Sequence, residues 1–211
     1  MSREYKIRTK NPNVFLRVTK GHFVTMHSHT NYYIDVTTQK NRLSEAKAVA
    51  REMVSAYQAN TIVDTILCLD GTEVIGAFLA EELTKDNYIN LNAHQTIYVV
   101  SPEFVGGGQM IFRDNLTPTL AGKHVLILTA SVTTGKSALA AIDAIKYYGG
   151  IVVGVSAIFA TVRECDGHPV HSIFDPNDLG DYQSYKPHQC PFCQSGKKIQ
   201  ALVNSFGYSA L

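Results

Sequence analysis

Residues 123–150 read KHVLILTASVTTGKSALAAIDAIKYYGG, and this stretch decides the fold. The apolar run at 124–128 is typical of a strand that is buried on both faces of a parallel sheet. Apolar residues then recur at helical spacing from Ala138 until the pair Gly149-Gly150, and a second apolar run follows at 151–160. This pattern predicts a βαβ unit with a hydroxyl- and glycine-rich turn at the start of its helix. Free backbone N–H groups and the helix dipole favour an anion there, and phosphate is the expected ligand.

Strands and helices alternate on the N-terminal side of this unit as well. We expect a strand at 62–69, a helix at 73–83 and a further strand at 96–100, after an amphipathic helix that begins near Ser44. This alternation predicts an α/β fold with a doubly wound parallel sheet. Ligands of such sheets bind at the carboxyl ends of the strands, so the loops that begin at Asp70, Ser101 and Thr129 should line one site.

Composition and charge exclude several classes of function. The chain has 211 residues with 45% hydrophobic content, which suits a single domain with its own core. The net charge is +1 and there is no basic block, so we expect neither a nucleic-acid polymer nor a membrane as partner. The beginning of the chain lacks an apolar signal, and four scattered cysteines do not make a disulfide framework. A cytoplasmic location with reduced thiols is expected.

Two motifs resemble the type I phosphoribosyltransferases. The turn containing Thr133, Thr134, Gly135 and Ser137 is similar to the loop with which that family holds a 5′-phosphate. Residues 21–33 (GHFVTMHSHTNYY) are similar to the hood segment of orotate phosphoribosyltransferases, G-H-F-x-L-x-S-G-x-x-S-x-x-Y, although the S-G pair is missing. The resemblance implies a single domain over residues 1–211, with a hood at 1–43, an α/β core at 44–165 and a tail at 166–211. It also implies a homodimer.

The resemblance further implies roles for individual residues. The loop at Asp70 would cradle pyrophosphate, with Mg2+ bound alongside the phosphoribosyl ligand. The long segment 101–122 would be a mobile catalytic loop, and a disordered or β-hairpin excursion is the alternative. Asp70 and Glu73 are candidate catalytic residues that position magnesium or a ribose hydroxyl. Arg113 is a candidate for stabilising the leaving pyrophosphate, and a solvated arginine or a salt bridge to Asp114 are the alternatives. Thr129 is the candidate ribose contact. The candidate phosphate-binding residues are Ser131, Thr133, Thr134, Gly135, Lys136 and Ser137.

Departures from the family pattern leave the function open. The two acids that normally hold the ribose are replaced by Thr129 and Ala130, and the pyrophosphate loop carries two acids instead of none. The sequence favours a protein that binds a phosphoribosyl ligand such as phosphoribosyl pyrophosphate (PRPP) or a nucleoside 5′-monophosphate. Weak or altered transfer of phosphoribose to a pyrimidine-type base such as orotate would make it a glycosyltransferase of pyrimidine metabolism.

Two other functions fit the same turn. The first alternative is a catalytically silent sensor of a nucleotide. The second is a P-loop-like NTPase, because residues 130–137 follow a relaxed Walker A spacing that ends in Gly135-Lys136-Ser137. In that case Asp70 would be the Walker B acid and ATP should bind much more tightly than AMP.

The tail carries a separate motif, Cys190-x-x-Cys193, which is half of a zinc site. Cys165 is the candidate third ligand for Zn2+, while a plain turn or a redox pair are alternatives. The hood histidines His22, His27 and His29 are either ligands, substrate contacts or solvated loop residues. Apolar residues in 199–206 predict a short amphipathic helix that docks on the core or across a dimer interface.

Overall fold

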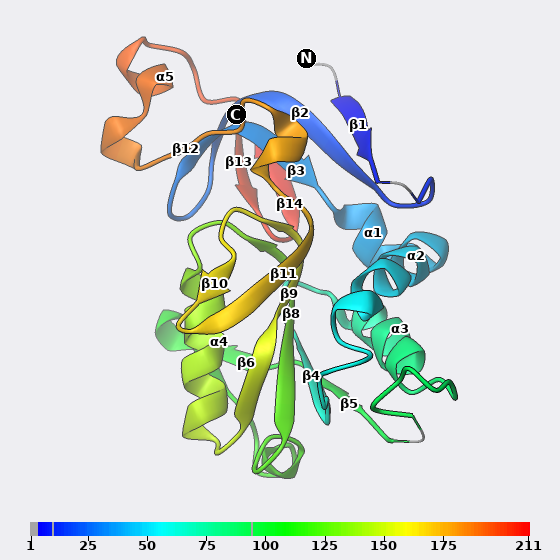
Figure 1. Cartoon of the computed structure of the whole chain (residues 1–211). Helices are drawn as coiled ribbons and strands as arrows, with labels where there is room; N and C mark the ends of the chain where they lie inside the picture. Colours follow the sequence, from blue (N-terminus) through cyan, green and yellow to red (C-terminus); the bar gives the residue numbers. More distant parts are fainter. Residues whose placement is uncertain (1–3, 10, 94) are drawn as a thin grey trace.

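The computed structural model describes residues 4–9, 11–93 and 95–211. It has a six-stranded core sheet with a second six-stranded sheet above it (Figure 1). The core sheet has the order β10-β11-β9-β8-β4-β5, and every neighbouring pair except β10–β11 is parallel. Helix α4 covers one face, and α2 and α3 cover the other. The predicted doubly wound sheet is confirmed. Its elements are β4 (Thr65–Cys68), β5 (Tyr98–Val100), β8 (His124–Val132), β9 (Ile151–Ala160), β10 (Glu164–Cys165), β11 (His168–Phe174), α2 (Leu43–Met53), α3 (Glu73–Leu83) and α4 (Lys136–Tyr147).

Strand β8 shows why the sheet is buried on both faces. Leu126, Leu128 and Ala130 enter the core beneath α2 and α3, whereas Val125 and Ile127 enter the core beneath α4. Alternate side chains of a strand point to opposite faces, so the continuous apolar run supplies both cores at once. The carboxyl end of β8 is thereby fixed at the upper edge of the sheet, where the phosphate-type turn begins.

The hood forms the second sheet, with the order β12-β3-β2-β13-β14 and β1 paired to β2. The predicted sheet-like layer at the beginning of the chain is confirmed, but the C-terminal residues also join it. Strand β13 runs parallel to β2, and the β13–β14 hairpin reaches from the hood toward the core (Figure 1). The strands are β1 (Glu4–Arg8), β2 (Phe15–Val24), β3 (His29–Asp35), β12 (Ser184–Tyr185), β13 (Ala201–Asn204) and β14 (Gly207–Ala210).

The amphipathic helix predicted at 199–206 is wrong, because this part of the chain forms the β13–β14 hairpin. Its turn is closed by Asn204, whose side-chain oxygen accepts hydrogen bonds from the backbone N–H groups of Phe206 and Gly207 at 2.9 and 3.1 Å. Residues of this segment pair instead with the free edge of β2, as strand β13. Tertiary pairing has thus overridden a helical spacing of apolar residues.

The remaining elements are short. The segment expected as a mobile loop contains the antiparallel hairpin β6 (Glu103–Val105) and β7 (Gln109–Ile111), and the tail includes the four-residue helix α5 (Pro191–Gln194). Helix α1 (Thr37–Asn41) links the hood to α2. Turns of 3-10 helix lie at Val54–Ala56, Gly106–Gly108, Thr117–Thr119, Pro176–Leu179 and Pro187–Gln189.

The predicted boundary between core and tail does not coincide with the end of the core sheet. Strand β11 lies in the segment 166–211 that was assigned to the tail, yet it pairs with β9 in the core sheet. Residues 1–3 and 10 of the hood segment lie outside the described residues. Among the helices of the described ranges, none has the length and apolar character needed to cross a lipid bilayer.

Candidate functional site

A cavity of about 270 Å³ lies between the upper edge of the core sheet, the hood and the C-terminal hairpin. Its position at the carboxyl ends of parallel strands is the expected one for this architecture. The core contributes the ends of β4, β8 and β9, and the hood contributes β3 with the loop before it. The residues that line the cavity include Asp70, Ala130, Ser131, Thr133, Ser137, Thr25, His27, Tyr32, Tyr33, Asn204 and Ser205.

The phosphate-type turn opens into this cavity. Gly135 is the N-cap of α4 and has φ 73°, a left-handed conformation that glycine adopts without strain. The first N–H groups of α4 have no partner inside the helix and are free for an anion. Three of the predicted phosphate-binding residues, Ser131, Thr133 and Ser137, line the cavity. Thr134 and Lys136 are exposed beside it and are not among its lining residues.

Asp70 is held at the cavity by the residue that was expected to contact ribose. The Thr129 hydroxyl donates to Asp70 Oδ2 at 2.5 Å, and Thr129 is only 2% exposed. Asp70 itself has φ 59°, so the loop after β4 turns its carboxylate back across the sheet edge. The expectation for Thr129 needs correction, since its hydroxyl is spent on Asp70 and it does not line the cavity. Asp70 is the acid that faces the ligand space.

Lys40 was missed by the sequence reasoning and lies directly behind this loop. Its Nζ donates to the carbonyl oxygens of Asp70 at 2.6 Å and Ser205 at 2.5 Å. Burial lowers the pKa of Lys40, while the nearby Asp70 and Glu73 carboxylates oppose that shift. The buried Lys40 ammonium thus compensates part of the negative charge of Asp70 and Glu73. A lone lysine in a short helix gives no local signal of this role.

Arg113 and Glu73 do not line the cavity. Arg113 makes a bidentate ion pair with Glu103 of the β6–β7 hairpin, with Nε–Oε2 and Nη2–Oε1 distances of 2.8 and 2.7 Å. This pairing differs from the sequence-based expectation of a salt bridge to Asp114. Glu73 accepts a hydrogen bond from the Ser101 hydroxyl at 2.6 Å. Both remain candidates for catalysis only if the 101–122 segment moves on ligand binding.

Hood aromatics form the wall opposite the phosphate-type turn. The Tyr32 hydroxyl donates to Asp181 Oδ1 at 2.5 Å, and Tyr32 is buried. Burial raises the pKa of Tyr33 to about 12, so this phenol stays protonated at neutral pH. An apolar, aromatic wall opposite polar groups suits a ligand with a flat ring at one end and a phosphate at the other.

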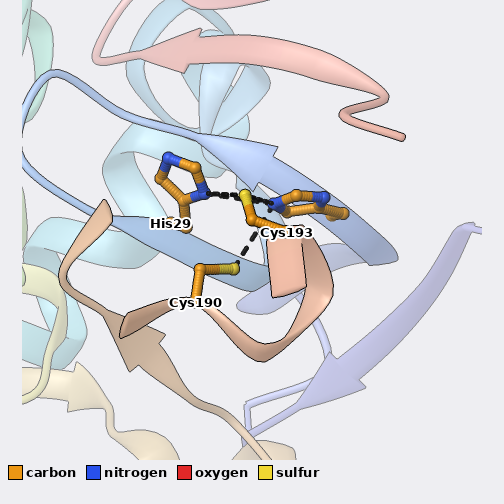
Figure 2. Close-up of side chains that lie close together, drawn as sticks. His29, Cys190 and Cys193 are labelled. Atoms are coloured by element: carbon orange, nitrogen blue, oxygen red, sulfur yellow. Dashed lines mark hydrogen bonds between the residues drawn. The ribbon is translucent and has the colours of Figure 1, made fainter. Parts of the chain in front are cut away.

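A second group of functional side chains lies outside the cavity. His22, His29, Cys190 and Cys193 place one ligand atom each within 4.8 Å of one another. In Figure 2 the His29 ring and the Cys190 and Cys193 sulfurs point toward one shared space. The cysteine pair and two of the three hood histidines are therefore brought together. Burial lowers the pKa of His29, and so does the neighbouring His22 ring, which favours a neutral imidazole.

Cys165 corrects the sequence-based metal prediction. It lies on β10 with its Sγ 3.6 Å from the Gly135 carbonyl oxygen, beside the phosphate-type turn. It is not part of the histidine–cysteine group. The spacing from 165 to 190 was compatible with a shared site, but β10 is at the far edge of the core sheet and the cysteine pair is on the hood.

The fold of this chain is similar to that of solved phosphoribosyltransferases. Orotate phosphoribosyltransferase of Mycobacterium tuberculosis, solved with Fe(III) dicitrate, superposes with a TM-score of 0.54 at 21% identity, covering 79% of this chain and 93% of that one. UMP synthase of Leishmania donovani gives 0.57 at 16% identity, covering 85% of this chain and 36% of that one. The fold expected from the turn and hood motifs is therefore confirmed.

Sequence comparison finds similarity to curated orotate phosphoribosyltransferases. Orotate phosphoribosyltransferase of Chlorobium phaeobacteroides is 26% identical over 188 residues, which cover 86% of each chain. The enzyme of Campylobacter fetus is 26% identical over 193 residues, covering 85% of this chain and 89% of that one. No protein-family model matches the chain. The resemblance to orotate phosphoribosyltransferases is confirmed along most of the chain.

Proposed function

We propose that this protein binds a phosphoribosyl ligand in the cavity between core and hood and transfers phosphoribose to a pyrimidine-type base. The observation that carries the proposal is the shared cavity itself. The helix N-terminus at Gly135 and the hydroxyls of Ser131, Thr133 and Ser137 meet one end of it, and the hood aromatics meet the other. A nucleoside 5′-monophosphate has the matching polarity, with an anion at one end and a ring at the other.

Solved structures of similar fold support a phosphorylated ligand. The Mycobacterium tuberculosis orotate phosphoribosyltransferase has been solved with inorganic phosphate and with PRPP. For this chain we assign the phosphate to the six residues of the turn named from the sequence, with Ser131, Thr133 and Ser137 contributing side chains. The pyrimidine-type base is assigned to the hood side of the cavity, where Tyr32 and Tyr33 lie.

The ribose end is where this chain departs from its relatives' pattern. Among the residues lining the described cavity, Asp70 is the one acid, and Thr129 and Lys40 fix its loop from two sides. One carboxylate with free lone pairs suits a ribose hydroxyl, or a Mg2+ ion that is shared with ligand phosphates. We assign Asp70 to that role. Mg2+ would supply neutralisation of the diphosphate charge when it binds with PRPP.

The test is a thermal-shift panel of UMP, orotidine 5′-monophosphate, AMP, PRPP and ATP, with and without Mg2+. A ligand at 100 times its Kd stabilises the native state by about 2.7 kcal/mol, which raises Tm by roughly 5–11 °C for a chain of this length. Pyrimidine monophosphates and PRPP should shift Tm most. A panel in which only ATP stabilises the protein would overturn the proposal, because it would favour the P-loop reading.

A silent sensor of a nucleotide is the second candidate, and Thr129 and Ala130 favour it. They stand where the family's acid pair would support a ribose that acquires positive character, and one lost charged contact in such a site costs on the order of 3 kcal/mol. Orotate-dependent release of pyrophosphate separates the two functions. Monophosphate binding without pyrophosphate release would assign the protein as a sensor.

The proposal extends to the cellular location and the oligomeric state of the protein. We place it in the cytoplasm, because all four cysteines are free thiols, and we expect it to act as a homodimer. Sedimentation or light scattering tests the second point.

A further inference from the structure

Four ligand atoms on the hood have the spacing of a tetrahedron around one metal ion. The His22 Nε2–His29 Nδ1 distance is 3.1 Å, and Cys193 Sγ lies 3.7 and 3.3 Å from those two nitrogens. Cys190 Sγ lies 3.5 Å from His22 Nε2. Usual zinc–nitrogen and zinc–sulfur bonds give tetrahedron edges of about 3.3 Å between nitrogens and about 3.6 Å between nitrogen and sulfur. The donors already match these edges.

The two histidines are presented by neighbouring hood strands. His29 on β3 is paired with Val24 on β2, so His22, two residues earlier on β2, lies diagonally across on the same face. The pairing of β2 with β3 shifts register between Lys20 and Phe23, directly at His22. Such irregularities re-aim side chains, and here both rings converge.

The tail fixes His22 in the form that a metal requires. His22 Nδ1 donates to the Lys197 carbonyl oxygen at 2.9 Å, which leaves the lone pair on Nε2 for a ligand. The Phe192 ring, between the two cysteines, packs on the His22 ring with centroids 5.3 Å apart. His22 is fully buried, so its unprotonated nitrogen needs a partner inside the cluster.

The backbone at His22 is clamped as tightly as its ring. Gln200 N donates to the His22 carbonyl oxygen at 2.9 Å, and His22 N donates to Gln200 Oε1 at 3.1 Å. A Cβ at Gly21 would lie 1.7 Å from Gln200 Oε1, so a larger residue at position 21 would displace the Gln200 side chain from this contact. The tail therefore docks where the ligand atoms meet.

We propose that His22, His29, Cys190 and Cys193 bind one zinc ion in a closed Cys2His2 site. Two thiolates and two imidazoles are a usual zinc donor set, and four protein ligands leave no open position for a substrate or an activated water. The site is structural. A redox role for the cysteine pair does not account for two histidine nitrogens converging on the same point.

The zinc ion would act on the cavity through the segments that it joins. The loop between His22 and His29 contributes Thr25 and His27 to the cavity, and the hairpin after Cys193 contributes Asn204 and Ser205. The metal ties both segments together at their bases. This second part rests on the proposed function, since it predicts that metal loss weakens the base side of the site more than the phosphate side.

Metal content of the purified full chain tests the site directly, without any assumption about function. Zinc should be present at a ratio near one per chain in the wild type and near zero in His22→Ala and Cys193→Ser. The matched controls are Cys165→Ser, which removes the third ligand predicted from the sequence, and His188→Ala, which removes a histidine next to the cysteine motif; both should keep zinc. A wild-type ratio near zero after supply of Zn2+, or loss of zinc only in Cys165→Ser, would overturn the proposal.

Cobalt keeps the test decisive if the ligand variants do not fold. Wild-type protein stripped by a chelator and loaded with Co2+ should show tetrahedral visible bands together with thiolate charge-transfer absorption. An octahedral spectrum without thiolate bands would refute the site. Hydrogen exchange tests whether the metal holds the tail on the hood. Metal removal should increase amide exchange in 186–211 and 22–29, while β8 and β9 stay protected. Unchanged protection of the tail would refute that role.

Ligand binding by the stripped protein separates this inference from the proposed function. UMP should lose at least tenfold in affinity on metal removal while inorganic phosphate keeps its affinity within about twofold. Failure of the zinc-loaded protein to bind UMP at all would count against the proposed function and leave the metal site standing. Equal losses for both ligands would refute the selective effect on the base side.

Discussion

Replacement of Gly135 by alanine tests whether the turn before α4 is shaped for phosphate. Gly135 has φ 73°, and an added Cβ would lie 3.5 Å from Cys165 Sγ, an ordinary contact. The cost therefore comes from the backbone: a left-handed conformation costs alanine about 1–2 kcal/mol, and the stiffer unfolded chain returns about 0.4–1 kcal/mol. We expect a net loss of about 1 kcal/mol in unfolding free energy, or roughly 2–4 °C in Tm for this chain length.

The affinity for a monophosphate should fall further than the stability. If the strained turn misplaces one N–H group that would face the phosphate, the lost charge-assisted hydrogen bond costs about 1.5–3 kcal/mol. Gly135→Ala should thus bind UMP and inorganic phosphate at least tenfold more weakly. Isothermal titration measures the affinity, and urea denaturation measures the stability.

Gly149→Ala is the matched control. Gly149 follows the other end of α4, has φ 75° and has open space where a Cβ would be placed. It should lose a similar amount of stability and keep full affinity. Equal losses of affinity in the two variants would show that the effect is global, and unchanged affinity in Gly135→Ala would refute a phosphate site at this turn.

Three further predictions concern other parts of the molecule. Thr129→Val removes the donor to the Asp70 carboxylate and should lower the unfolding free energy by about 1–3 kcal/mol in urea titrations, whereas Thr129→Ser should restore it. Arg113→Gln should reduce pyrophosphate release and leave UMP affinity unchanged; full turnover in this variant would remove Arg113 from the mechanism. Burial opposes ionisation of Glu45, but hydrogen bonds led by Arg17 outweigh it and lower its pKa below the ordinary value of 4.5. That stabilisation is present above pH 4.5 and is lost as the pH falls through the lowered pKa, so acid titration of Glu45→Gln should show a flatter stability profile there.

The core of the protein followed from local patterns in the sequence. Helix α3 has the predicted bounds, 73–83, and β9 has the predicted bounds, 151–160. Both are set by periodic apolar residues that need no knowledge of distant segments. The strand predicted at 62–69 is shorter, at Thr65–Cys68, and Ile62 lies exposed before it.

Two parts of the candidate site were predicted from the sequence, the phosphate-type turn and Asp70 after β4. Ser131, Thr133 and Ser137 come from one contiguous turn, and they do line the cavity. Lys40 Nζ donates to the carbonyl oxygens of both Asp70 and the hairpin residue Ser205, which lie far apart in the chain, and no local pattern marks Lys40 or Ser205.

The sequence by itself determined the parallel core and the anion-binding turn at its edge, since strand alternation, helical spacing and turn chemistry are short-range properties. Only the tertiary structure decided what closes the site. His22 and Cys190 are 168 residues apart in the chain, and they meet because β13 pairs with β2 and carries the tail onto the hood. Such a meeting depends on the pairing of a free sheet edge and on the entropy of closing a long loop, which no window of sequence encodes.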